Sequence, residues 1–266
     1  MLTSERQRTI KELAMTNGEV SISELASRFQ VSIETIRRDI NLLCKKNLLK
    51  KVRGGAVPIE FTVREDAYEV RYRQNYGRKS AIGAYIAANL IEDNDIIALS
   101  SGSTIEVLAS SITARNLLIV TNSINIASIL QNRMRQGMLS GEVIMLGGVL
   151  RSDEHYTGGS LAVEMLKKFT FDKVFLGVSA VSGRDVMTYH IEEGVIMSTM
   201  IDQARFCCVA ADASKFDIRS TYVFADLATI DAVVTEEDAE LSEEMLATFA
   251  QTGARHHRAP LTVTEE

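Results

Sequence analysis

The sequence predicts an α/β protein in two parts: a small, mostly helical head and a larger domain of alternating strands and helices. Apolar residues at helical spacing fill the first 57 residues, and from about residue 77 short apolar runs alternate with helical segments. The charge is also divided. Residues 1–57 carry eleven Lys/Arg and six Asp/Glu, whereas residues 58–266 carry 18 and 29. A basic head on an acidic body indicates that the head meets a polyanion.

The composition excludes several classes of protein. With 266 residues, 46% hydrophobic and 24% charged, the chain has the values of a globular protein. The longest apolar stretch, Ala81 to Ile91, is shorter than the ~20 residues of a membrane span. The first ten residues have no apolar core, so they do not form a signal peptide. Three cysteines without an export signal favour free thiols, and we expect a cytoplasmic protein without a membrane contact.

The head begins with two predicted helices. Ser4 to Thr16 has apolar residues at helical spacing, and Asn17-Gly18 follows as a stop signal. The second helix is short and ends at Phe29. Ser21 and Glu24 have the spacing of a capping box, which predicts that their side chains satisfy the first amides of this helix.

A third, longer helix from Ile33 to about Lys46 is amphipathic, and Ser32 precedes it as an N-cap residue. At about 100° per residue its apolar stripe consists of Ile33, Ile36, Ile40 and Leu43. Arg38 lies opposite this stripe, with Thr35 and Asn41 near it and Arg37 at the flank. Arg, Thr and Asn are residues that read base edges in the major groove of DNA, but a solvated surface helix would show the same pattern.

The segment after the third helix distinguishes these readings. Leu48 to Arg53 is a basic strand, and Gly54-Gly55 supplies a turn. A short capped helix, a three-residue connection, a recognition helix and a basic strand pair make a winged helix-turn-helix over 1–57. The candidate DNA-binding residues are Ser21, Ser32, Thr35, Arg37, Arg38, Asn41, Lys51 and Arg53.

Four stretches of the head form a recognisable pattern: Val20–Ala26, Phe29–Ser32, the string Thr-Ile-Arg-Arg-Asp at Thr35–Asp39, and Arg53–Ala56. In these stretches the head resembles the DNA-binding domain of the DeoR/GlpR family of bacterial regulators of sugar metabolism. The resemblance implies a sequence-specific regulator that binds double-stranded operator DNA. Arg53 stands where the family usually has His, which keeps a phosphate contact possible.

Residues 58–76 show no clear apolar stripe and are predicted to be a connector, and 77–266 to be the second domain. Apolar runs in that domain end in small or polar residues and alternate with helices. The runs are Asp95–Leu99, Leu117–Val120, Val143–Leu146, Val174–Val178, Phe206–Ala210 and Ala232–Val234. This pattern predicts a mostly parallel, Rossmann-like sheet covered on both faces.

Ligands in such sheets bind beyond the carboxyl ends of the strands. The string Ser100-Ser101-Gly102-Ser103-Thr104 joins a strand to a helix start, where unpaired amides and the helix dipole favour an anion. The alternative is a simple helix cap. The string lacks the Gly-Lys-Ser/Thr of a P-loop, and the chain has no GxGxxG.

The resemblance to the DeoR family extends over this domain to about residue 240. It implies a fold similar to ribose-5-phosphate isomerase and a phosphorylated sugar effector. The implied effector-binding residues are Ser101, Gly102, Ser103 and Thr104 at the phosphate and Asn122, Gly148, Glu193, Asp212 and Lys215 at the sugar. The sequence departs from the family pattern at Ser100 (usually Asp), Ala213 (usually His) and Gly194 (usually Ala).

Lys215 and Glu193 have an alternative interpretation as solvated surface charges. Cys207-Cys208 lies in an apolar strand and is predicted to be buried, whereas His256-His257 is predicted to lie in an exposed, mobile C-terminal tail. No metal ligand set, cofactor or catalytic residue is predicted.

Two functions remain. The first is a repressor of a carbohydrate-utilisation operon that is relieved by a sugar phosphate and acts as a homodimer or homotetramer. The second is a sugar-phosphate isomerase-like enzyme with an accessory DNA-binding domain. The DNA-binding head favours the regulator.

Overall fold

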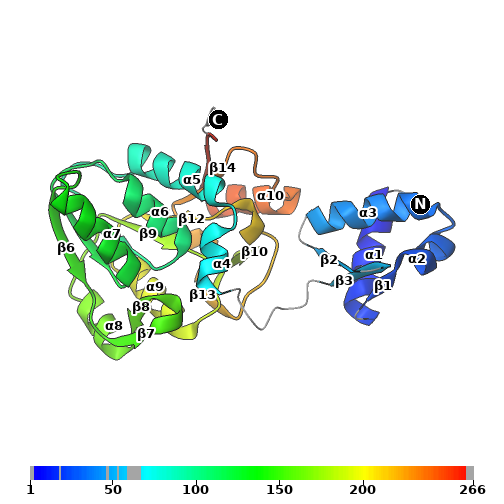
Figure 1. Ribbon diagram of the computed structural model, residues 1–266, viewed down its shortest axis with the longest axis horizontal. Coiled ribbons are helices and arrows are strands. Elements are labelled where there is room, and N and C mark those ends of the chain that lie inside the picture. Colours follow the sequence, from blue (N-terminus) through cyan, green and yellow to red (C-terminus); the bar gives the residue numbers. More distant parts are fainter. Residues whose placement is uncertain (1–2, 18, 46–47, 53, 59–66, 262–266) are drawn as a thin grey trace. The chain divides into compact units, whose positions relative to one another are not determined.

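The computed structural model describes residues 3–17, 19–45, 48–52, 54–58 and 67–261. The chain divides into two compact units, Met1–Val63 and Arg64–Glu266 (Figure 1). Each unit has its own hydrophobic core, so each is described by itself.

The N-terminal unit is the predicted winged helix-turn-helix. Helices α1 (Thr3–Asn17), α2 (Ile22–Phe29) and α3 (Ile33–Lys45) pack beside a three-stranded antiparallel sheet. Its strands β1 (Val20–Ser21), β2 (Leu49–Val52) and β3 (Gly55–Pro58) lie in the order β1-β3-β2. Gln30 has a left-handed backbone with φ of 53°, which ends α2 and turns the chain toward α3.

Two local predictions for this unit were wrong. Ile33 is 49% exposed, whereas the other three residues of the predicted stripe are buried. Side chains tilt toward the start of a helix, so the first residue of α3 projects past its packed part. Ser21 does not form a side-chain cap, because its strand pairs with Gly55 and its hydroxyl lies 2.8 Å from Ser23 Oγ.

The C-terminal unit is built on a seven-stranded sheet in which every neighbouring pair is parallel, as predicted. The strand order is β15-β14-β12-β9-β4-β5-β6. The strands are β4 (Ile96–Leu99), β5 (Leu117–Thr121), β6 (Gly141–Met145), β9 (Lys173–Gly177), β12 (Cys207–Ala210), β14 (Ala232–Glu236) and β15 (Arg255–Ala259). The chain adds strands on one side of β4 and then continues on the other side from β9.

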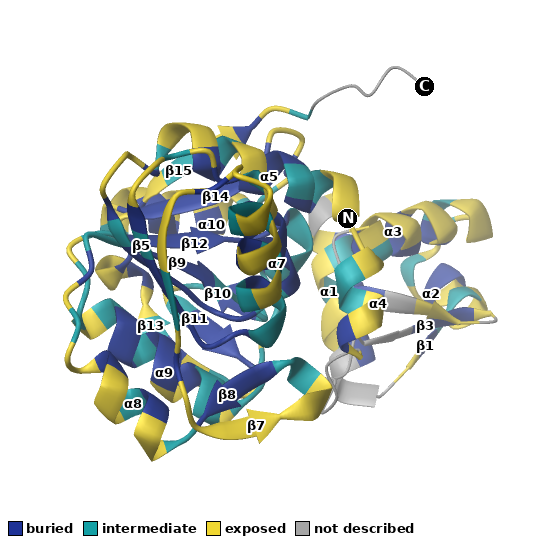
Figure 2. Cartoon of the chain, turned by 60° about the vertical axis from the view of Figure 1, so that its left-hand side comes forward, coloured by how far each residue is buried: buried dark blue, intermediate teal, exposed yellow. Residues whose placement is uncertain are grey.

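Helices cover both faces of this sheet. One core lies under α5 (Tyr76–Asn89), α6 (Ser103–Ser111) and α7 (Ile124–Arg135), and the other lies under α8 (Ser160–Leu166), α9 (Ile191–Asp202) and α10 (Glu243–Thr252). The central strands are buried (Figure 2). Cys207 belongs to one core and Cys208 to the other, so both predicted buried thiols are confirmed.

Smaller elements border the sheet. Strands β10 (Ala180–Ser182), β11 (Asp185–Thr188) and β13 (Tyr222–Asp226) form an antiparallel sheet. Strands β7 (Val149–Arg151) and β8 (Tyr156–Gly158) form a hairpin around the turn η1 (Ser152–Glu154). Two further single turns are η2 (Ala213–Lys215) and η3 (Leu227–Thr229).

The predicted connector is helical in its C-terminal part. Helix α4 (Tyr68–Arg73) lies within it, and α5 starts at Tyr76. Tyr68 is only 8% exposed, so α4 packs on the body although it is too short to show an apolar stripe. Residues 59–66 of the connector lie outside the described residues.

The predicted C-terminal tail is also ordered at its two histidines. His256 and His257 lie in β15, paired with Val233 and Val234 at the edge of the sheet. A polar edge strand lacks the apolar run by which strands are recognised in the sequence. Residues 262–266 lie outside the described residues. Among the helices of the described part, none has the length and apolar character needed to cross a membrane.

Candidate functional site

The exposed face of α3 is the candidate nucleic-acid interface. Arg37, Arg38 and Asn41 are all exposed on it. The Arg37 guanidinium lies 3.6 Å from the Glu34 carboxylate in an exposed pair, whereas Arg38 forms no ion pair within the described part of the chain. The Arg38 guanidinium is therefore available for a bidentate bond to a base.

Two other predicted residues order the start of this helix. Ser32 Oγ accepts a hydrogen bond from the Thr35 amide (3.1 Å), which confirms the predicted cap, and lies 2.8 Å from Thr35 Oγ1. On the wing, Lys51 Nζ donates to Asn41 Oδ1 at 3.1 Å and so joins β2 to α3. Arg53 lies outside the described residues.

Asp39 is a residue of the Thr-Ile-Arg-Arg-Asp string whose role the sequence did not reveal. It is 2% exposed and accepts from Arg6 Nε at 2.6 Å and from Gln7 Nε2 at 2.9 Å. Both donors come from α1, so Asp39 fixes α3 against α1. With Ile36, Ile40 and Leu43 it forms the buried side of α3, which leaves the two arginines before it exposed.

The candidate effector site lies where the strand order reverses. The loops after β4 and β9 meet there, since the Gly177 amide donates to Ser100 Oγ at 3.0 Å. Ser100 is 1% exposed and also donates to the Ser101 carbonyl (3.0 Å). Its hydroxyl thus joins the two loops. A crevice between the carboxyl ends of two such strands is where open α/β sheets bind ligands.

The start of α6 presents main-chain donors just beyond the carboxyl end of β4. Gly102 is the N-cap residue, with φ of +120° and without a side chain to cap the helix. Its carbonyl accepts from the amides of Ile105 and Glu106. The amides of Ser103 and Thr104 precede these and have no partner within the helix, which is the arrangement that binds anions.

Ser101 and Glu193, predicted separately, are in contact. Ser101 Oγ donates to Glu193 Oε1 at 2.6 Å, and Thr188 Oγ1 donates to the other carboxylate oxygen at 2.5 Å. The adjacent Gly194 is packed against the ring of Tyr222, where a Cβ atom would lie 2.4 Å from Cδ1. The glycine therefore gives Tyr222 the space that an alanine would occupy.

Asp212 and Lys215 lie on the loop after β12. Asp212 is 1% exposed and accepts from Asn75 Nδ2 (2.8 Å) and from the amide of Ser214 (3.1 Å). Lys215 ends the turn η2. The Ala213 amide donates to the buried Glu236 carboxylate at 3.1 Å, so the loop is fixed on β14 through its main chain.

Asn122 has an unsatisfied acceptor. Its residue is 1% exposed, and its Nδ2 donates to the Thr157 carbonyl at 3.3 Å, but its Oδ1 accepts no hydrogen bond from the described residues. A buried polar atom without a partner is costly, and a ligand hydroxyl is a suitable donor. Gly148, by contrast, has a structural role: with φ of +143° it lies so close to Gly158 that a Cβ atom would be 2.3 Å from the carbonyl oxygen.

Four residues of the site were missed in the sequence. Lys79 is 3% exposed and donates to Ser103 Oγ at 2.9 Å and to the Arg71 carbonyl. Glu106 is 4% exposed and accepts from Tyr68 and from Asn125 (3.1 Å). Lys79 was recognisable, since it lies on the same helical face as the buried Ile82 and Ile86. Tyr68 and Arg71 gave no such signal because α4 has only six residues.

Burial governs the charges of this cluster. The pKa of Lys79 is lowered to about 8, mainly by burial; Asp212 opposes this shift, and the nearby Lys215 and Arg71 contribute to it. Burial also raises the pKa of Glu106. The Arg71 guanidinium is paired with Glu154. Lys79 thus brings a buried cationic group to the start of α6, with the charges of Lys215 and Arg71 near it, which suits an anion.

Comparison with known proteins covers both units. A DeoR-like helix-turn-helix domain matches residues 6–62, and a DeoR C-terminal sensor domain matches residues 74–237. The HTH-type transcriptional repressor GlcR of Bacillus subtilis is 30% identical over 89% of each chain. The lactose phosphotransferase system repressor of Streptococcus mutans is 29% identical over 89% of this chain and 93% of its own.

A solved ribose 5-phosphate isomerase from Plasmodium falciparum covers 52% of each chain, with 12% identity and a TM-score of 0.37. The curated relatives are transcriptional regulators, which sets aside the isomerase-like enzyme as the function. A sensor-domain match over more than half of the chain, joined to a matching helix-turn-helix domain, places this chain in the DeoR family of helix-turn-helix transcriptional regulators of sugar metabolism.

Proposed function

We propose that this regulator represses a carbohydrate-utilisation operon and that a phosphorylated sugar releases it from operator DNA. The observation that carries the proposal is the start of α6, just after β4, where the amides of Ser103 and Thr104 have no partner within the helix and the buried ammonium of Lys79 donates to Ser103 Oγ. These groups favour a phosphate dianion over an uncharged sugar. The names of the two relatives, both called repressors, support the direction of control.

The sugar part of the ligand is proposed to lie toward Asn122 and the loop after β12. The unsatisfied Asn122 Oδ1 accepts a hydrogen bond from a sugar hydroxyl group. Asp212 offers a further hydrogen-bond acceptor and Lys215 a donor. The Glu193 carboxylate, held by Ser101 and Thr188, lies beside the proposed phosphate loop. Because ligand alters DNA affinity only through its differential affinity for two conformations, we expect a change of about 5-fold to 150-fold.

The experiment compares operator affinity of the wild type and Gly102→Val by fluorescence anisotropy, with an operator selected from random duplexes. The φ of +120° at Gly102 is strained for any side chain, so the variant should distort the phosphate loop. We expect unchanged DNA binding and loss of the response to sugar phosphates. Gly137→Val is the matched control, because Gly137 also has a positive φ (+69°) but follows α7, away from the carboxyl ends of the strands.

Equal responses of the wild type and Gly102→Val would contradict phosphate binding at this loop. If the wild type bound operator but no member of a pentose- and hexose-phosphate panel changed its affinity, the effector class would be wrong. Sustained aldose–ketose conversion of the same panel would revive the enzyme interpretation.

We also propose that the regulator is a cytoplasmic homodimer or homotetramer assembled through its C-terminal unit. Exposed apolar side chains gather on the neighbouring elements β7, α8 and α9: Val149, Leu150, Leu161, Met165, Ile191 and Val195. Leu161 is 69% exposed. Such surfaces mark protein interfaces. Light scattering should give a dimer or larger for the wild type and a smaller species for Leu161→Glu, while a monomeric wild type with and without DNA would refute the proposal.

A further inference from the structure

We propose that Lys79 binds both the effector phosphate and helix α4, so that effector binding strengthens the attachment of α4 to the sensor domain. The inference rests on the proposed function for its ligand. It assigns the transmission of the signal to one side chain and one short helix, which lies in the segment that follows the DNA-binding unit.

The contacts of Lys79 carry this inference. Its ammonium lies 2.9 Å from Ser103 Oγ on the phosphate loop and donates a second hydrogen bond to the main-chain carbonyl of Arg71 in the last turn of α4. A lysine ammonium has three protons, so a third can bind a ligand oxygen without breaking either bond. The side chain therefore links the predicted phosphate position directly to α4.

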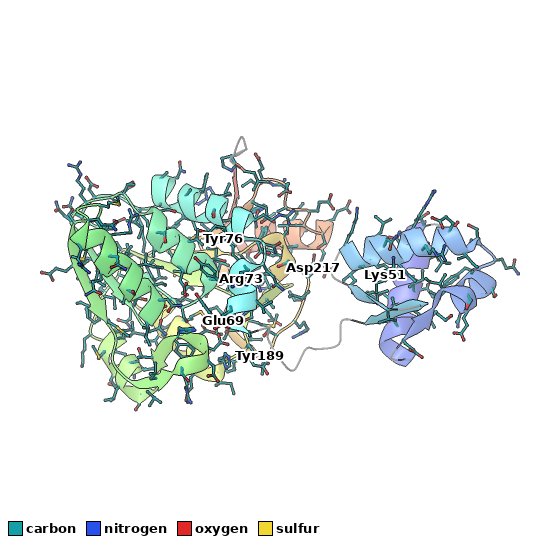
Figure 3. The ribbon with its side chains drawn as sticks, in the orientation of Figure 1. Lys51, Glu69, Arg73, Tyr76, Tyr189 and Asp217 are labelled. Carbon is teal, nitrogen blue, oxygen red and sulfur yellow. The ribbon has the colours of Figure 1, made fainter. Side chains whose placement is uncertain are left out.

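Other contacts of α4 and of the junction that follows it also lead to the site. Tyr68 donates to the buried Glu106 on α6, and Arg71 is paired with Glu154. At the α4–α5 junction Asn75, in a left-handed conformation, donates to Asp212 at 2.8 Å. The side chains of Glu69 and Arg73 on α4 and Tyr76 at the start of α5 are marked in Figure 3. Between Tyr68 and Asn75 the chain is thus held mainly by polar bonds, and the Tyr68 ring is the main apolar surface that this segment buries.

The charge balance explains why a phosphate would tighten this attachment. Without ligand, the buried Lys79 ammonium faces Asp212 and Glu106 but also Lys215 and Arg71. A dianion at the amides of Ser103 and Thr104 adds negative charge beside the ammonium. The charged form of Lys79 is then favoured, and its hydrogen bond to the α4 carbonyl strengthens.

The test is hydrogen exchange of the full-length protein, read by mass spectrometry on peptides that cover residues 67–79. Glucose 6-phosphate, ribose 5-phosphate and inorganic phosphate are the probes, and their affinities are measured by calorimetry. In the wild type, a saturating probe should slow exchange in α4. In Lys79→Met without ligand, α4 should exchange faster than in the wild type, and probe affinity should fall by about 10-fold to 100-fold.

Two variants separate the two contacts of Lys79. Lys215→Met makes the same chemical change on the loop after β12 and leaves the Lys79 bond to the Arg71 carbonyl in place, so it should weaken probe binding without speeding α4 exchange in the absence of ligand. Ser103→Ala removes the loop-side acceptor, and it too should weaken binding without loosening α4 in the absence of ligand. Both variants should still slow α4 exchange at saturation, whereas Lys79→Met should not.

Three results would overturn the proposal. Unchanged α4 exchange in ligand-free Lys79→Met would refute the link to α4, whatever the effector is. Protection of α4 by saturating probe in Lys79→Met would show that the signal bypasses this side chain. If no probe slowed exchange in α4 of the wild type, the proposed role of phosphate and the proposed effector class would both be wrong. The comparison of ligand-free wild type with ligand-free Lys79→Met would still test whether Lys79 holds α4. Thermal unfolding of each variant establishes that it is folded.

Discussion

Replacing Asp39 by Asn should destabilise the DNA-binding unit selectively. The Asp39 carboxylate is 2% exposed and accepts from Arg6 Nε at 2.6 Å and Gln7 Nε2 at 2.9 Å, while Arg6 is itself 8% exposed. An Asn side chain has one acceptor oxygen for these two donors and no charge. The variant would therefore leave a buried guanidinium without its counter-ion.

The expected magnitude follows from burial. Breaking a buried ion pair by removing one partner costs about 3–5 kcal/mol. A unit of the length of Met1–Val63 has a free energy of unfolding of only about 3–9 kcal/mol. Asp39→Asn should therefore remove much or all of the free energy of unfolding of this unit. The sensor unit has a separate core and should keep its stability.

Hydrogen exchange of peptides from α1 and α3 gives the free energy of opening of this unit within the whole chain, and operator affinity gives the functional readout. The control is Glu34→Gln, an acid-to-amide change in the same helix, because the exposed Glu34–Arg37 pair at 3.6 Å contributes about 0–1 kcal/mol. If Asp39→Asn changed exchange in α1 and α3 no more than Glu34→Gln does, the buried pair would not hold α3 in place.

Three further predictions concern DNA reading, packing and pH. Arg38→Ala should lower the binding free energy for the selected operator by about 1–3 kcal/mol and relax base preference in anisotropy titrations. Lys51→Ala should instead weaken binding to all DNA sequences alike. Unchanged affinities of Arg38→Ala for operator and random DNA would exclude a role of Arg38 in reading bases. Gly194→Ala should lower the free energy of unfolding by about 1–3 kcal/mol, because its Cβ would collide with the Tyr222 ring; an unchanged melting temperature would contradict this packing. A phosphate dianion favours charged Lys79, whose pKa is lowered to about 8. Sugar-phosphate affinity should therefore be highest between about pH 7 and pH 8, above the second pKa of the phosphate at about 6, and fall by up to about tenfold per pH unit at higher pH. Calorimetry should find that this fall is smaller in Lys79→Met, and equal pH profiles would refute the assignment.

The sequence by itself determined the architecture of both units. The stripe of Ile36, Ile40 and Leu43 fixed the inner face of α3, and the alternation of short apolar runs with helices fixed the parallel sheet. These features are local, since each follows from the periodicity of one segment. The sequence also singled out the loop from Ser100 to Thr104 as the proposed anion site, because a strand end followed by a helix start offers unpaired main-chain amides.

Contacts between distant segments had to come from the tertiary structure. Asp39 became a structural residue because Arg6, 33 positions earlier, reaches it, and His256 joined the sheet because β14 supplies a parallel partner. Lys79 and α4 entered the site for the same reason. Polar bonds join α5 to α6, and they join the predicted connector to α6, to Glu154 and to the loop after β12. The periodicity of a single segment cannot reveal such pairings between segments.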